Sequence, residues 1–182
     1  MSFVPLGYMA KRIAARPEWL DVPAVRDIYS VSPCISENFC DYVKYWRHNG
    51  FWLFDSPATI QELANDEQLE LSHTNLFYYE AYEFEFDAIA NCWRKFVPEQ
   101  AFSTEVSAPS VRSLVGFDVA TFSQGNAAEC SPLSCNHLAS EIEVNQHCLL
   151  NSWQEGKTHL DGGRFDDTEP GPFRIIAVYQ PE

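Results

Sequence analysis

Residues 76–87, LFYYEAYEFEFD, constrain the fold more than any other part of the chain. Aromatic residues are enriched in β-strands, and the second half of this segment alternates in polarity with the period of two that a strand imposes. One face would carry Tyr78, Glu80, Tyr82, Phe84 and Phe86, and the other Phe77, Tyr79, Ala81, Glu83, Glu85 and Asp87. We therefore predict a long strand here.

Shorter strands are predicted at 51–54, 115–122, 147–153 and 174–179, the last being apolar enough to be central. Apolar spacing predicts a helix over 39–47. Ser56-Pro57 marks another helix start. The serine hydroxyl can accept a hydrogen bond from a free N–H, and the N–H that proline lacks would have no partner at the first helical position. A further short helix would turn Leu138 and Ile142 towards the core.

Because these elements lack βαβ alternation, we predict an α+β fold, with one domain over residues 1–182 and a mainly antiparallel sheet packed with a few short helices.

The net charge of −14 lies almost wholly beyond residue 50. Residues 1–50 hold six basic and five acidic residues, whereas the remainder holds six and twenty-one, and no Lys or Arg occurs from residue 48 to 93. This field repels nucleic acid and anionic lipid, so we expect neither as a partner. It attracts a basic protein, although an acidic surface also serves solubility alone.

Three carboxylates, Glu83, Glu85 and Asp87, share one face of the long strand, with alternate residues about 6.7 Å apart. Such a face is a solvated exterior, a hard-cation site or a surface that recognises Lys and Arg. Phe77 and Tyr79 stand on the same face, and aromatic side chains beside charges resemble interface anchors with a polar rim. We therefore predict a non-enzymatic, acidic protein-binding module of the inhibitor or immunity type, which engages a basic partner through these five residues.

Glu80 falls among aromatic residues on the opposite face of this strand. Burial without a partner would favour its neutral form and make it a candidate general acid or base. The sequence shows no obvious partner carboxylate.

The only cluster of classical metal ligands in the sequence consists of Cys130, Cys135, His137, His147 and Cys148. The spacing of Cys130 and Cys135 occurs at zinc sites, which makes Cys130, Cys135 and His147 candidate ligands. Alternatively, Cys135 near a helix N-terminus is a candidate nucleophile and His137 its base. The alternative function is thus an enzyme with a cysteine or metal site on the loop 123–137. Core cysteines beside a polar loop are the structural interpretation of the same residues.

The common phosphate, dinucleotide, serine-hydrolase and zinc-protease motifs are missing from the sequence, so no cofactor is expected. The first twenty residues lack the apolar stretch of a secretory signal, and six cysteines without one are typical of reduced thiols. We therefore expect a cytoplasmic protein without a membrane span.

A second alternative function is a small-molecule binder, because 26 Phe, Tyr and Trp residues permit an aromatic-lined cavity.

Overall fold

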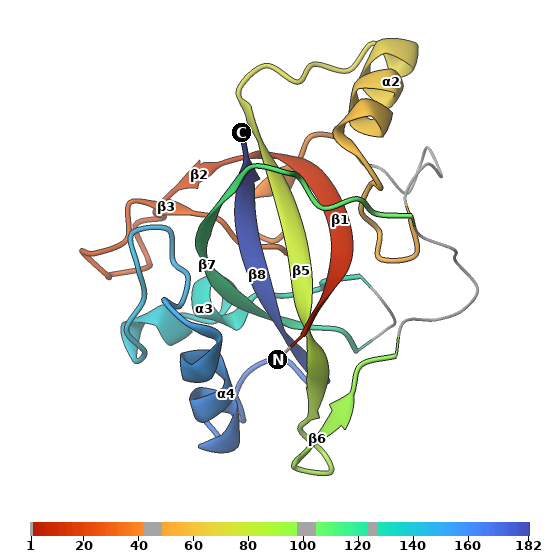
Figure 1. The fold of residues 1–182 in the computed structure, drawn as a ribbon. Helices are drawn as coiled ribbons and strands as arrows, with labels where there is room; N and C mark the ends of the chain where they lie inside the picture. Colours follow the sequence, from red (N-terminus) through yellow and green to blue (C-terminus); the bar gives the residue numbers. More distant parts are fainter. Residues whose placement is uncertain (1, 42–48, 98–104, 124–126) are drawn as a thin grey trace.

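A computed structural model describes residues 2–41, 49–97, 105–123 and 127–182 (Figure 1). Within these ranges six strands form one antiparallel sheet in the order β4-β1-β5-β8-β7, with β6 paired to β5. The strands are β1 (Phe3–Arg12), β4 (Glu37–Asn38), β5 (Thr74–Asp87), β6 (Cys92–Lys95), β7 (Arg112–Thr121) and β8 (Phe173–Pro181). Two short strands, β2 (Ala14–Ala15) and β3 (Asp27–Ile28), pair separately. The predicted α+β fold with an antiparallel sheet is confirmed.

The centre of the sheet is formed by the two segments with the strongest strand patterns. Residues 76–87 lie within β5, residues 174–179 lie within β8, and most of residues 115–122 lie in β7. Strand β8 runs between β5 and β7, and its first six residues are buried. A strand covered on both faces has no solvated side to mark with polar residues, which explains its continuous apolar run.

The helices are α2 (Pro57–Glu67), α3 (Pro132–Cys135), the 3-10 turn η1 (Leu138–Ser140) and α4 (Trp153–Asp161). The Ser56 hydroxyl accepts the Thr59 N–H at 3.2 Å, so the predicted cap of α2 is present. Figure 1 shows α2 beside β1, whereas α3 and α4 lie on the β7 and β8 side of the sheet. The helix predicted over 39–47 falls largely on residues 42–48, outside the described residues. None of the described helices is long and apolar enough to cross a bilayer.

The strand predicted at 147–153 is wrong. The Asn145 side-chain oxygen accepts the N–H groups of His147 (2.9 Å) and Leu149 (3.2 Å), which holds this segment in a turn. A side chain that bonds the nearby backbone in this way competes with a strand ladder. Only one isolated bridge to β7 remains, at Leu150, and Ser152 caps α4 directly afterwards through the Glu155 N–H.

The segment 51–54 also differs from the predicted strand. Only Phe54 pairs, in an isolated bridge to Tyr8 of β1. Phe51 and Phe54 are nevertheless buried, so the aromatic residues enter the core as predicted but without a ladder.

Candidate metal centre

Three cysteine sulfurs converge at one point of the fold. The Sγ atoms of Cys34, Cys130 and Cys135 all lie within 4.8 Å of one another. Cys34 comes from the segment between β3 and β4, Cys130 follows β7, and Cys135 ends α3. Two of the three predicted ligands, Cys130 and Cys135, are thus brought together, with Cys34 as the third member of the cluster.

A buried aspartate on the sheet fixes the two segments that carry these cysteines. Asp118 of β7 is 1% exposed, and its Oδ2 accepts the Val31 N–H at 2.8 Å and the Ser131 hydroxyl at 2.7 Å. Ser131 lies next to Cys130, and Val31 lies three residues before Cys34. The Asp118 carboxylate therefore fixes both the segment before Cys34 and the segment after Cys130.

A buried lysine completes this support from β1. Lys11 is fully buried, and its Nζ donates to three successive carbonyl oxygens, those of residues 30, 31 and 32, at 2.8, 3.1 and 2.7 Å. An ammonium group has three donors and no acceptor, so this arrangement satisfies it completely. The backbone leading to Cys34 is therefore fixed by charge-assisted hydrogen bonds.

Burial sets the ionisation of both charged groups. Loss of hydration lowers the pKa of Lys11 to about 7, while Asp118 and the cysteines favour its charged form. Loss of hydration also raises the pKa of Asp118 to about 6, against the opposing effect of its hydrogen bonds from Ser131 and Val31. Lys11 is therefore about half protonated near pH 7, and negative charge on Asp118 and on the cysteines favours its ammonium form.

Cys34 is the thiol that ionises most readily. Hydrogen bonds from Cys130 and then Cys135 lower the pKa of Cys34, and the charge of Lys11 acts in the same direction. The pKa of Cys130 is raised by its contacts with the Cys135 and Cys34 sulfurs and by burial. Ionisation of one of the three thiols therefore changes the pKa of the others, and among them the pKa of the exposed Cys34 is the one that is lowered.

An open pocket of about 440 Å³ lies over the cysteines. Besides the three cysteines its walls are mostly polar, formed by Thr121, Ser123, Glu129, Asn136, Glu169 and Pro170. Cys130 Sγ donates to Asn136 Oδ1 at 3.2 Å, and the thiol form of Cys34 donates to the Glu129 carbonyl oxygen at 3.2 Å. The cluster is thus anchored on one side and faces solvent on the other.

Neither predicted histidine joins the cysteine cluster. His147 Nδ1 lies 2.5 Å from Asp27 Oδ1, and its ring stacks on Tyr29 with centroids 4.1 Å apart. His137 adopts a left-handed conformation (φ 60°) and packs against Trp19 with centroids 4.4 Å apart. His147 is therefore replaced by Cys34 in the candidate ligand set, and no hydrogen bond from His137 to Cys135 is found in the described structure.

Sequence reasoning misses Cys34 because no local spacing links it to the other two cysteines. It lies far from them in the chain, within a Ser-Pro-Cys sequence that matches no ligand motif. Tertiary contacts bring it close, among them the hydrogen bond from the Val31 N–H, three residues before Cys34, to Asp118 of β7. The only sign in the sequence that Cys34 could be a ligand is that it is a cysteine.

The predicted binding face on β5 is not an exposed surface. Phe77 and Tyr79 are 0% exposed and belong to the core. Glu85 is buried and pairs with Arg174 at 2.8 Å and Arg94 at 2.7 Å. The prediction assumed one solvated face, but residues 77–81 are all buried, so both faces of the strand are covered there.

The remaining acidic candidates on β5 also have partners. Asp87 Oδ2 lies 2.9 Å from Arg94 Nη1, and Glu83 Oε1 accepts the Ser2 N–H at 2.9 Å. Glu80 is buried and accepts hydrogen bonds from Arg112 at 2.8 Å and the Tyr78 hydroxyl at 3.0 Å. The arginines that neutralise this strand lie on β6, β7 and β8, so its own sequence gave no sign of them.

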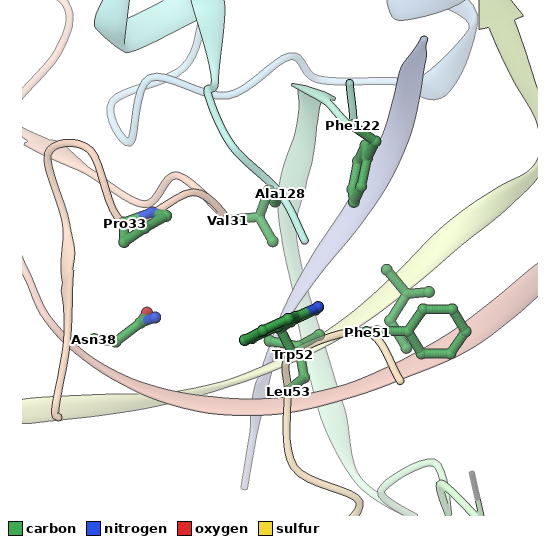
Figure 2. Close-up of a pocket in the computed structure, with 9 residues that line it drawn as sticks. Val31, Pro33, Asn38, Phe51, Trp52, Leu53, Phe122 and Ala128 are labelled. Atoms are coloured by element: carbon green, nitrogen blue, oxygen red, sulfur yellow. The ribbon is translucent and has the colours of Figure 1, made fainter. Parts of the chain in front are cut away.

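An apolar cavity lies elsewhere, lined by Leu6, Val31, Pro33, Asn38, Phe51, Trp52, Leu53, Phe122 and Ala128. Figure 2 shows Asn38 and Trp52 facing one another across it. Its volume is about 20 Å³, enough for about one water molecule, whereas small-molecule sites usually measure hundreds of Å³. The Asn38 Oδ1 atom is buried with no partner in the described part of the chain, so a single water suits this cavity.

Comparison of the chain with protein-family models, with curated proteins and with solved structures found no match.

Proposed function

We propose that this chain is a metal-binding protein in which Cys34, Cys130 and Cys135 hold a thiolate-preferring ion, foremost Zn²⁺. The observation that carries the proposal is the mutual approach of the three sulfurs within 4.8 Å. Zn–S bonds of about 2.3 Å at tetrahedral angles place sulfur atoms about 3.8 Å apart. Small side-chain rotations bring the three sulfurs to that spacing.

The number of thiols favours a metal over thiol chemistry. A disulfide joins two sulfurs and leaves the third unexplained. A cysteine nucleophile requires a base within hydrogen-bond reach, and both candidate histidines are engaged elsewhere in the described structure. Three converging thiols are a ligand set that zinc commonly uses.

The charge balance supports the same proposal. A divalent ion with three thiolates carries one net negative charge, and Lys11 beneath the site supplies the compensating positive charge. Without such a partner, a buried anionic complex would be costly.

Elemental analysis of the purified, reduced protein after loading with Zn²⁺ tests this proposal. We expect about one ion per chain, and loss of most of it in Cys34→Ser, Cys130→Ser and Cys135→Ser. Cys92→Ser is the matched control, because Cys92 is exposed on β6, outside the cluster. Full zinc content in Cys34→Ser, or none in the wild type, would refute the proposal.

A basic protein partner is a second proposal, supported by the net charge of −14. Exposed carboxylates on and after α2, including Glu62, Glu67 and Glu70, suit such a partner better than the paired β5 face. Reversing these three charges to Lys should weaken binding of any partner recovered by affinity capture, and flatten its salt dependence. Unchanged binding with unchanged salt dependence would count against this surface.

A further inference from the structure

The cysteine cluster supplies three metal ligands where a tetrahedral ion takes four. Among the described residues, the group of Cys, His, Asp and Glu atoms that could share one ion contains only these three sulfurs. Structural zinc sites are closed by four protein ligands, whereas sites with three keep a position for water or substrate. The fourth position is therefore available to an outside ligand.

The pocket over the cysteines has the size and polarity to admit that ligand. It measures about 440 Å³, and Cys34 at its edge is exposed. Thr121, on its wall, is 1% exposed, and its hydroxyl has no hydrogen-bond partner within the described ranges. A buried hydroxyl without a partner is unfavourable, so a bound group that meets it would gain affinity.

The charges around the pocket discriminate between ligands. Glu129 and Glu169 both line it, and three thiolates with a divalent ion add one more negative charge. Among the described residues, Lys11 is the cation that interacts electrostatically with the cysteines, and it is buried and held by backbone carbonyl oxygens. Anionic molecules would be repelled from this pocket, whereas neutral and cationic ones would not.

We propose that this pocket binds a small neutral or cationic molecule whose sulfur, nitrogen or oxygen atom takes the fourth position on the metal. The inference rests on the proposed metal site. Thr121 supplies a hydrogen-bonding hydroxyl to the bound molecule, and the two glutamates select against negative charge. The metal polarises the atom that binds it.

The test uses the full chain loaded with Co²⁺, which takes zinc's place and absorbs light through its thiolate ligands. Three thiols of similar size serve as probes: cationic cysteamine, neutral 2-mercaptoethanol and anionic mercaptoacetate. Each is titrated while the thiolate-to-cobalt absorption and the bound cobalt are measured. We expect saturable new absorption at constant cobalt content, with cysteamine preferred over mercaptoacetate.

Because the three thiols differ in their intrinsic affinity for cobalt, the decisive quantity is the change in preference between variants. In Glu129→Gln/Glu169→Gln, the preference for cysteamine over mercaptoacetate should fall by about tenfold, the scale of a few unit charges acting across partly solvated space. Glu62→Gln/Glu67→Gln on α2 is the matched control and should keep the wild-type preference. Thr121→Val should bind each probe several-fold more weakly with its cobalt content unchanged.

The outcomes separate this inference from the proposed function. Stoichiometric cobalt that no probe perturbs would overturn the open position and leave the metal site standing. Saturable binding with the same preference in the glutamine variant would overturn the selection by charge. A Thr121→Val variant with wild-type affinities would remove the role of the hydroxyl. Failure to bind cobalt would overturn both proposals.

Discussion

The buried ammonium of Lys11 makes stability depend on pH in a direction that can be calculated. Its pKa is lowered from 10.5 to about 7 by burial. Between these two values the unfolded chain binds more protons at this position than the folded chain does. The free energy of unfolding contributed by Lys11 therefore rises with pH in this window, and its contribution is least favourable below about pH 7.

The magnitude follows from the size of this shift. Each pH unit inside the window contributes at most about 1.4 kcal/mol, and the rise from pH 7 to pH 9 integrates to about 2 kcal/mol. Lys11→Met abolishes the titration, so the wild type should gain about 2 kcal/mol relative to the variant over that range. The absolute stability of the variant is a separate quantity, because it leaves three carbonyl oxygens without their donor.

Urea unfolding of both proteins at several pH values measures this difference. Serine at positions 34, 130 and 135 in both proteins removes thiol ionisation and metal from the comparison. Parallel stability curves between about pH 7 and pH 9 would refute the reasoning. If Lys11→Met does not fold, an NMR titration of the Lys11 side chain in the wild type measures the same pKa, and a value near 10.5 would be equally decisive.

Three further predictions concern the unfolding free energy measured in urea. Glu85→Gln should lower it by about 3 kcal/mol, because it weakens a buried ion pair with Arg174. Ser152→Ala should lower it by about 1 kcal/mol through loss of the α4 cap. Gly116→Ala should lower it by about 1–3 kcal/mol, since the new Cβ would lie 2.8 Å from the Leu149 Cβ.

Neighbouring substitutions provide the controls. Glu83 lies on the same strand as Glu85, but in the described contacts its side chain accepts a hydrogen bond only from the exposed Ser2 N–H, so Glu83→Gln should change stability by less than about 0.5 kcal/mol. Equal effects at positions 83 and 85 would contradict the account of the buried pair. A Gly116→Ala variant that is more stable than the wild type would contradict the predicted clash with Leu149. A Ser152→Ala variant with unchanged stability and helix signal would contradict the predicted loss of the α4 cap.

Local patterns predicted β5, β7, β8 and α2, but not β1, which pairs with β5, nor α4. Strand β5 and the apolar run of β8 follow from alternation and burial, and α2 from the cap at Ser56. The error at 147–153 arose because the hydrogen bonds that the Asn145 side-chain oxygen accepts from the His147 and Leu149 N–H groups outweighed β-propensity. The Ser152-x-x-Glu155 pattern that opens α4 was present as a signal for that helix.

The candidate site could be predicted only in part. The spacing of Cys130 and Cys135 is local and visible, whereas Cys34 and the supporting Lys11 and Asp118 are brought there by pairing across the sheet. The β5 carboxylates were misjudged for the same reason. Arg174 lies far from Glu85 in sequence but opposite it in register.

The support of one backbone segment by Lys11 of β1 and Asp118 of β7 links the assembly of the three-cysteine cluster to the pairing of the sheet. These two strands are not neighbours in the sheet, so residues 30–34 reach their position only when the strands between them have paired. A chain in which these strands have not paired would lack the contacts that bring Cys34 to Cys130 and Cys135. If the proposed metal site exists, an unfolded chain should therefore compete poorly for the ion.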